Sequence, residues 1–391
     1  MDFRFSAEDE KFRQEVRDFC ERELPPDWMM GEFFAEEGLE TEEEWVFYHQ
    51  FKRKMGARGW LSIGWPKQYG GQASRMKFAI LEDEINYYGA PGLDASLTYG
   101  IVTPTLIGHC NEEQKKKHLP PLARGEVIWC EGFSEPNAGS DVAVLISRAV
   151  KEGDYFVANG QKTWSSLGHH ADWGIFLFRT DPNVPRHKGI SMFLVDMTSP
   201  GITRNPIKNR LSHATWCETF LDNVKIPQEN LVGELGQGWE ITMNTLNNER
   251  SGMQWLSTSR RGLHRIIKYV KERPNLAKNP IIRHKVANLA IEVELSRLFC
   301  YYIEYLRAQG KTPIHEASMV KVFSADLSVR VADTCFEIMG LHGQLARGSK
   351  WAPLSGTIME AYLGFSPWTM AGGSPEIQKN VIATMGLRLP R

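Results

Sequence analysis

The sequence WCEGFSEPNAGSDVA occupies residues Trp129–Ala143 and decides the fold. Its first residues predict a strand, and Pro136–Gly139 demands an irregular backbone. Ser134 and Ser140 bracket that loop with hydroxyl groups. Short polar groups at the edge between a strand and a loop suit the polar rim of a flat heterocycle. A plain strand followed by a turn explains the same residues equally well.

A second motif, GQKTWSS, follows at Gly160–Ser166. Because side chains alternate along a strand, Trp164 and Ser166 are predicted to point the same way. An aromatic ring with a hydroxyl two residues further on suits one face of a flat cofactor ring. The alternative is a tryptophan that simply belongs to the core.

The net charge of −1 at pH 7 removes the simplest argument for a nucleic-acid partner, because phosphate backbones attract strongly basic surfaces. The N-terminus has no apolar signal segment, and no stretch is long and apolar enough to predict a membrane span. The six cysteines are dispersed without a CxxC pair. This favours a reducing compartment without disulfides or a metal site, and we expect a cytoplasmic enzyme.

The first zone of the chain has a helical pattern. Ser6 is suited to cap the first helix, because acidic residues follow in its first turn. Apolar residues then recur at helical spacing, at Phe12, Val16 and Phe19. Residues 43–59 and 76–88 predict two further helices.

The second zone is rich in β-branched and aromatic residues separated by turn residues, which predicts strands. The expected strands cover residues 146–150, 155–158, 174–178 and 191–195. Residues 151–154 are predicted to form the tip of a hairpin. These features indicate a small antiparallel β domain.

The third zone is helical again. Residues 239–271 predict a single helix of roughly 50 Å, and 287–308 and 317–339 predict two more. The predicted fold class is α+β. The expected domains are an N-terminal helical domain at 1–124, a middle antiparallel β domain at 125–232, and a C-terminal domain like a four-helix bundle at 233–391.

Taken together, the two motifs resemble the flavin-binding signature of the acyl-CoA dehydrogenase family. A third stretch, AGGSPEIQKNVIA at Ala371–Ala383, resembles the motif that closes the chains of this family. The helical, β, helical order matches over essentially the whole chain. The resemblance implies α,β-dehydrogenation of an acyl-CoA thioester to the trans-2-enoyl-CoA. In that reaction a base removes the α-proton, and the N5 atom of FAD accepts a hydride from the β-carbon.

The resemblance also implies roles for individual residues, with FAD bound between the β domain and the C-terminal helices. The flavin ring is expected to contact Phe133, Ser134, Trp164 and Ser166. The CoA moiety is expected to contact Ser140, Asn247 and Arg250. Ser374 and Glu376 are expected near the adenosine half of FAD, in part from a neighbouring subunit.

The catalytic base requires a separate argument, because many family members carry it in the closing motif just before a Gly-Thr pair. That position here is Gly372, which cannot act as a base. A second family arrangement places the base on a helix of the C-terminal domain, and Glu249 occupies that place. We therefore expect Glu249 to be the base and the backbone N–H of Gly372 to contact the thioester oxygen. A solvated helix glutamate is the alternative.

Two further stretches depart from the family pattern. The family usually has an Arg-x-x-Phe-Gly motif; here Arg273 keeps its charge, but the Phe-Gly is absent. A later glycine motif keeps Gly340 and Gly343 but lacks the usual Gly-Gly pair. The resemblance implies that Arg273, Gly340 and Gly343 bind FAD. The resemblance implies electron-transferring flavoprotein as the electron acceptor and a homotetramer or a heteromeric dimer of dimers. The alternatives are a partner subunit that shares an FAD site, an acyl-CoA oxidase, or a flavin monooxygenase.

Overall fold

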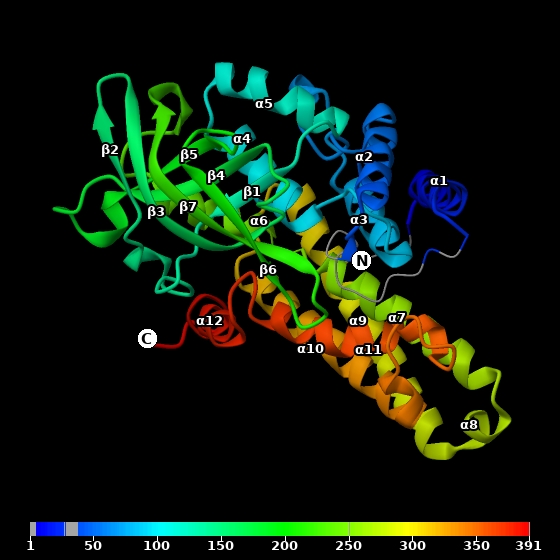
Figure 1. Ribbon diagram of the computed structural model, residues 1–391. Coiled ribbons are helices and arrows are strands. Elements are labelled where there is room, and N and C mark those ends of the chain that lie inside the picture. Colours follow the sequence, from blue (N-terminus) through cyan, green and yellow to red (C-terminus); the bar gives the residue numbers. More distant parts are fainter. Residues whose placement is uncertain (1–4, 27, 29–37, 250, 391) are drawn as a thin grey trace. The chain divides into compact units, whose positions relative to one another are not determined.

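The computed structural model describes residues 5–26, 28, 38–249 and 251–390 (Figure 1). The chain forms two compact units. The first contains the described residues of Met1–Leu39, Ser62–Leu93 and Arg250–Arg391, and the second contains Glu40–Leu61 and Asp94–Glu249. The helical, β, helical order of elements and the α+β class are confirmed. The three domain boundaries stay a prediction.

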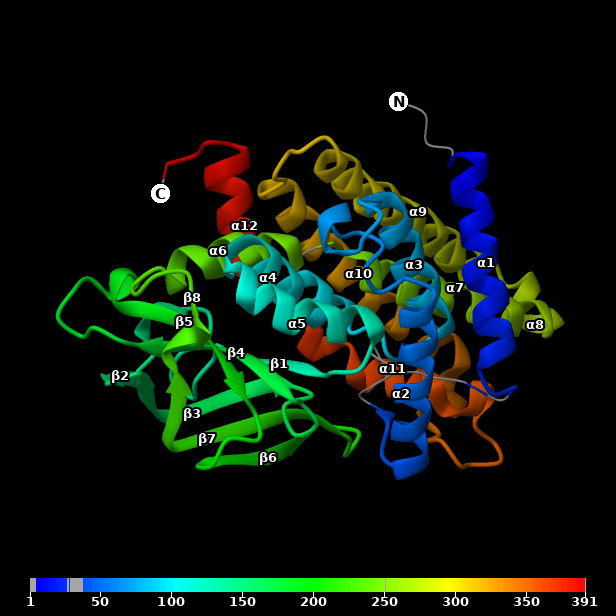
Figure 2. The same ribbon diagram turned by 90° about the horizontal axis from the view of Figure 1, so that it is seen from above.

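The first unit is helical. Its main helices are α1 (Ala7–Glu23), α3 (Arg75–Tyr88), α7 (Met253–Lys271), α8 (Pro274–Lys278), α9 (Pro280–Ala308), α10 (His315–Met339), α11 (Thr357–Gly364) and α12 (Pro375–Val381). The hydroxyl of Ser6 accepts a hydrogen bond from the backbone of Asp9 at 3.1 Å, which confirms the predicted helix cap. The long helices α7, α9 and α10 pack side by side (Figures 1 and 2).

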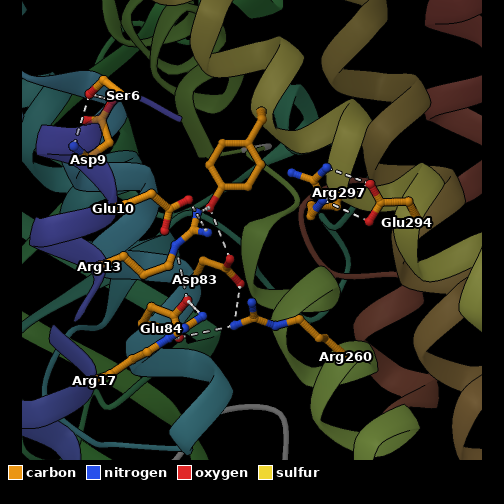
Figure 3. Close-up of polar contacts among 11 residues, drawn as sticks. Ser6, Asp9, Glu10, Arg13, Arg17, Asp83, Glu84, Arg260, Glu294 and Arg297 are labelled. Carbon is orange, nitrogen blue, oxygen red and sulfur yellow. Dashed lines mark hydrogen bonds and ion pairs between the residues drawn. The ribbon is translucent and has the colours of Figure 1, made fainter. Parts of the chain in front are cut away.

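A buried ionic cluster joins three helices of this unit (Figure 3). Arg17 of α1 donates two hydrogen bonds, 3.0 and 2.9 Å long, to the buried carboxylate of Glu84 on α3. Arg260 of α7 lies 3.2 Å from Asp83 and 3.4 Å from Glu84. Burying two adjacent carboxylates is tolerable because cations from two directions compensate them. The cluster therefore fixes α3 against both α1 and α7.

The predicted single helix over residues 239–271 is wrong. The structure has two helices there, α6 (Gly238–Glu249) and α7, which begins after Gly252. Gly252 has a left-handed backbone with φ of 76°, and a Cβ atom at this position would lie 2.2 Å from Val320 Cγ1 of α10. The left-handed backbone and the close approach of α10 both require a glycine at this position, and the second requirement is visible only in the tertiary structure.

The second unit contains the sheet. Its strands are β1 (Trp129–Gly132), β2 (Arg148–Glu152), β3 (Tyr155–Ser166), β4 (Trp173–Arg179), β5 (Ile190–Asp196), β6 (Ile202–Lys208), β7 (Ala214–Pro227) and β8 (Leu231–Val232). They form one sheet in the order β6-β7-β3-β2-β4-β5-β8, with β1 beside β4 (Figure 1). The hairpin predicted at 151–154 is confirmed, because Glu152 pairs with Tyr155 across a turn containing Gly153.

The prediction of a purely antiparallel sheet needs correction. Most ladders are antiparallel, but β1 runs parallel to β4, and β2 meets β4 in a short parallel contact. A β hairpin follows β1 before the chain reaches β4, so the connection is long enough for parallel pairing. Glycine makes the β1 contact possible, since a Cβ atom on Gly132 would lie 2.3 Å from the Phe176 ring.

Several helices accompany the sheet in the second unit. They are α2 (Glu42–Ala57), the π-helix η3 (Ala95–Val102), α4 (Thr103–His109), α5 (Glu112–Arg124) and α6. Helix α6 contacts β5, α4 and η3, and the buried hydroxyls of Thr105 and Thr245 lie 3.0 Å apart between α4 and α6. Lys52 of α2 forms a buried ion pair of 2.5 Å with Asp94, immediately before η3. These contacts set the direction of α6, which ends at Glu249.

Candidate functional site

The two sequence motifs meet in the second unit. The backbone N–H of Thr163 in β3 donates a 3.0 Å hydrogen bond to the carbonyl of Ser134, which follows β1. The ammonium of Lys162 lies 3.4 Å from the carbonyl oxygen of Phe133. Phe133 is buried, whereas Ser134 is partly exposed. Tertiary structure therefore joins the loop after β1 to the end of β3, as a shared ligand site requires.

A buried ion pair organises the loop, and sequence reasoning missed it. The Glu135 carboxylate accepts a 2.7 Å hydrogen bond from Lys162 Nζ and backbone hydrogen bonds of 2.7 and 3.0 Å from Ile146 and Ser147. The Glu135 side chain is 4% exposed, and the Lys162 side chain is 0% exposed. One carboxylate thus ties both ends of the loop to β3. Each motif contains one of these charged residues, Glu135 in the first and Lys162 in the second, but the sequence does not show that they form a pair.

Both groups of this pair have shifted pKa values. Burial lowers the pKa of Lys162 to about 8, against the opposing effect of the Glu135 carboxylate. Burial opposes ionisation of Glu135, but the nearby Lys162 charge and the hydrogen bonds to Ile146 and Ser147 lower the pKa of its carboxyl group overall. The pair is therefore ionised at neutral pH, and each charge depends on the other.

Trp164 lies in a β-bulge where β3 shifts register against β7 between Lys162 and Ser165. Its φ is 64°, an uncommon left-handed conformation for an aromatic residue, and its side chain is 55% exposed. Ser166 is partly exposed and Ser165 is buried, so the expected side-chain alternation returns after the bulge. Strained backbone tends to persist where function requires it. A large exposed ring beside accessible hydroxyls fits the flat ring of a flavin.

The other residues predicted in this unit lie on the surrounding loops and on α6. Ser140 is exposed in the loop that Glu135 anchors. Asn247 and Glu249 belong to the last turn of α6, where the structure describes the backbone alone. Arg250 lies outside the described residues. The same unit therefore carries the flavin-ring motifs and the helix that ends at the predicted base.

The closing motif lies in the first unit and has two left-handed glycines. The φ values are 67° for Gly372 and 98° for Gly373. The buried Gln378 donates a 3.2 Å hydrogen bond to the carbonyl of Gly372. Ser374 caps α12, and Glu376 stands exposed in its first turn.

The remaining predicted residues also lie in the first unit. Gly340 ends α10 with φ of 57°, and Gly343 is buried in the short turn that follows. The Arg273 guanidinium donates a 2.9 Å hydrogen bond to the carbonyl of Tyr269 and stacks 3.6 Å from the centre of its ring. This local contact orients Arg273, and its role towards a cofactor stays a prediction.

No group of three or more His, Cys, Asp or Glu side chains among the described residues is arranged to hold a metal ion. None of the described helices combines the length and the hydropathy needed to cross a bilayer.

Comparison with known protein families gives three matches in chain order. They are "Acyl-CoA dehydrogenase, N-terminal domain" at residues 6–126, the middle domain of the same family at 130–224, and its C-terminal domain at 236–387. The acyl-CoA dehydrogenase FadE26 of Mycobacterium tuberculosis is 30% identical over 406 residues, covering 100% of this chain and 99% of that protein.

Two solved structures show the same fold. The "Tcur3481-Tcur3483 steroid ACAD" matches with a TM-score of 0.91 and 30% identity, covering 100% of both chains. The ChsE4-ChsE5 complex from Mycobacterium tuberculosis matches with a TM-score of 0.89 and 30% identity, again over 100% of both chains. The predicted helical, β, helical architecture is thus confirmed.

Proposed function

The chain belongs to the acyl-CoA dehydrogenase family of flavin-dependent oxidoreductases, and from that premise we propose its reaction in detail. It oxidises an acyl-CoA thioester to the trans-2-enoyl-CoA. The observation that carries this proposal is the hydrogen bond from Thr163 to Ser134. It unites the two motifs near the end of β3, next to Trp164. Electron-transferring flavoprotein is the proposed electron acceptor.

FAD is the proposed cofactor, and it would supply the hydride acceptor at its N5 atom. Phe133 and Ser134 would contact one side of the ring system, with Trp164 packed against it and Ser166 at its edge. The exposed ring of Trp164 and the accessible hydroxyls of Ser134 and Ser166 support this assignment. For the adenosine half we propose a larger set of contacts: Arg273, Gly340, Gly343, Ser374 and Glu376.

Glu249 is the proposed base that removes the α-proton. Its support is its place at the end of α6, in the unit that carries the flavin-ring motifs, together with a glycine at the other family position. The backbone N–H of Gly372 is the proposed donor to the thioester oxygen, where negative charge develops. The hydrogen bond from Gln378 to the Gly372 carbonyl supports this role, because it holds the adjoining backbone in a defined orientation. Ser140, Asn247 and Arg250 would hold the CoA moiety.

The variant Glu249→Gln tests the base. We expect it to keep FAD and to lose about 10²- to 10⁴-fold in kcat, the usual contribution of a positioned base. Glu240→Gln is a matched control on the exposed face of the same helix and should keep near-normal turnover. Glu376→Gln, a proposed FAD contact, should bind FAD more weakly but turn over normally once loaded with FAD. Retained activity in Glu249→Gln would sink the assignment, and loss of turnover in FAD-loaded Glu376→Gln alone would move the base to the closing motif.

A partner subunit is the second candidate function. It is favoured by the similarity to the ChsE4-ChsE5 complex, whose name joins two different proteins. Purification of the chain alone, followed by measurement of FAD per subunit, distinguishes the two assemblies. One FAD per subunit with turnover supports a homomeric enzyme. A colourless preparation that becomes yellow and active after addition of a second chain supports the heteromer. Rapid oxygen consumption without another acceptor would instead indicate an oxidase or a monooxygenase.

Anaerobic bleaching of the flavin identifies the acyl group. The bound flavin is mixed with straight, branched, cyclic, aromatic and steroid acyl-CoA thioesters, and the rate of absorbance loss is compared. The substrate class that bleaches the flavin fastest at saturation is assigned. If no thioester in the panel bleaches the flavin, the proposed dehydrogenation is rejected for the chain as purified.

A further inference from the structure

A small cavity lies within the first unit, where α10 packs against both α7 and α11 (Figure 1). Its volume is about 20 Å³, which is enough for one water molecule or one small ion. The walls from α10 and α11 are largely apolar and include Val331, Ala332, Cys335, Ile358 and Ala361. Most of the polar lining therefore comes from α7.

Helix α7 turns one face to this cavity. The residues that line it are spaced by three, four and seven positions, which places their side chains on one side of a helix. They are Thr258, Arg261, Gly262 and Arg265. Gly262 lets α10 come close, because a Cβ atom at this position would lie 2.8 Å from Val331 Cγ1. The face that α7 turns to the cavity thus combines one hydroxyl with two guanidinium groups.

The Thr258 hydroxyl is the first indication that the cavity takes a ligand. Thr258 is 2% exposed, and its Oγ1 atom is buried without a hydrogen-bond partner among the described residues. Thr357 of α11 lines the same cavity, but its hydroxyl donates a 2.9 Å hydrogen bond to the carbonyl of Leu354. An unsatisfied hydroxyl is unfavourable in the interior. A ligand that accepts a hydrogen bond from Thr258 removes that cost.

The two guanidinium groups are the second indication. Arg261 is buried and donates a 3.0 Å hydrogen bond to the neutral carbonyl of Asn86. Burial, and then the positive charge of Arg265, lower the pKa of Arg261 to about 9. Burial lowers the pKa of Arg265 to about 10. Both groups still carry their charge at neutral pH, so two like charges share a poorly hydrated region that favours an anion.

The groups that act on these two arginines include Tyr87, Arg347 and Glu360. Tyr87 contributes a phenol, and Arg347 contributes a further positive charge. The Glu360 carboxylate accepts hydrogen bonds of 2.6 and 2.7 Å from Arg347. Among these neighbours and the two arginines, the positive charges outnumber the negative one.

We propose that this cavity, lined by Thr258, Arg261 and Arg265, is a binding site for a small monovalent anion such as chloride. The anion accepts a hydrogen bond from the Thr258 hydroxyl and lies against the two guanidiniums. A guanidinium presents five N–H donors, so Arg261 can hold Asn86 and also face an anion. Water would satisfy the hydroxyl without offsetting the charges, and sulfate or a phosphate group is too large for the cavity.

Thermal unfolding of the FAD-loaded protein in potassium chloride and potassium gluconate, at constant ionic strength, tests the site. Chloride should raise the unfolding midpoint along a saturation curve, because it binds only the folded protein, whereas gluconate is too large to enter. At a chloride concentration tenfold above its Kd, the expected rise is about 2 °C. Bromide should act in the same way, and anomalous diffraction should locate it in the cavity against Thr258 and Arg265.

Three variants assign the response to this cavity. Thr258→Val keeps the branched shape and removes the hydroxyl, so the Kd for chloride should rise about tenfold. Arg265→Met removes one charge and should abolish the response to chloride. Thr357→Val is the matched control, because its hydroxyl is already bonded to Leu354. It should lower the midpoint equally in both salts and keep the response.

Several results would overturn the proposed anion site. They are an equal unfolding midpoint in chloride and gluconate, bromide absent from the cavity in the crystal, or a full chloride response in both Thr258→Val and Arg265→Met. If Arg265→Met does not fold, Thr258→Val and the bromide position decide. None of these results alters the assignment of Glu249 as the base, because chloride binding is measured without turnover.

Discussion

Lys162 and Glu135 form a buried ion pair, 2.7 Å long, that connects strand β3 to the loop carrying Ser134 and Ser140. A single hydrogen bond in water contributes little to stability, but a charge buried without its partner is costly. The shape of the loop therefore depends on a pair of residues that lie outside any proposed contact with substrate. Its two members offer a direct test of how the site is built.

Lys162→Met should destabilise the protein by about 3–5 kcal/mol, because it leaves the Glu135 carboxylate buried without compensation. Urea unfolding measures the loss. Lys151→Met, at an exposed position on the β2–β3 hairpin, is the control and should change stability by less than about 0.5 kcal/mol. The double variant Glu135→Leu, Lys162→Met should recover most of the lost stability. A single variant as stable as the wild type would show that the pair is not a structural anchor.

Trp164→Gly should separate backbone strain from cofactor contact. Trp164 has φ of 64° and is 55% exposed, so glycine relieves the backbone and removes little buried surface. We expect the FAD-free protein to keep its stability or to gain about 1 kcal/mol. Loss of the ring should weaken FAD binding about tenfold, which corresponds to about 1.4 kcal/mol.

Trp164→Ala is the matched control, because it also lacks the ring but keeps the strained backbone. It should bind FAD as weakly as the glycine variant and be less stable than that variant without FAD. Unfolding of the FAD-free proteins and titration with FAD give both quantities. Unchanged FAD affinity in the two variants would remove Trp164 from the cofactor site.

Gly252→Ala should be far more damaging than Gly310→Ala. Both glycines are left-handed, with φ of 76° and 72°, but a Cβ atom at Gly252 would lie 2.2 Å from Val320 whereas at Gly310 it meets nothing within 4 Å. Gly310→Ala therefore reports the backbone cost alone, about 1 kcal/mol. Gly252→Ala adds overpacking and should cost about 3 kcal/mol in all. Equal losses in the free energy of unfolding would contradict the close approach of α10.

Glu82→Gln should change how stability depends on pH. The folded-state pKa of Glu82 is raised from 4.5 to about 8 by burial and then by the negative charge of Glu304, so the native protein holds a proton that the unfolded chain releases. This contribution is fully present below pH 4.5, declines as the pH rises, and is lost above about 8. The glutamine variant lacks that decline. Its stability relative to the wild type should therefore increase from pH 5 to pH 8, measured by urea unfolding at each pH.

If the difference in unfolding free energy between Glu82→Gln and the wild type stays constant from pH 5 to pH 8, the pKa of Glu82 is not raised in the folded protein. Arg75, Arg307 and Glu304 face Glu82 in both proteins, so their own titration cancels in the comparison. The surface variant Glu294→Gln is the control, because the Glu294 carboxylate that it replaces is 55% exposed and paired with Arg297 across one turn.

Features that depend on neighbours in the chain were predictable from the sequence. The cap at Ser6, the hairpin around Gly153 and the long helices α9 and α10 follow from residue type and spacing, because the interactions that form them lie within a few residues. The family was recognisable because the motif at Trp129–Ala143 resembles the family signature together with those at Gly160–Ser166 and Ala371–Ala383, in the family's order.

The tertiary structure alone decided the features that depend on distant partners. The need for a glycine at position 252 follows in part from the close approach of Val320 of α10. The bulge at Trp164 needs the register of β7. Glu135 meets Lys162, and Glu82 meets Ser251, only because folding brings separate elements together. A buried charge is favourable only beside its partner, and a pattern along the chain does not record which partner will be near.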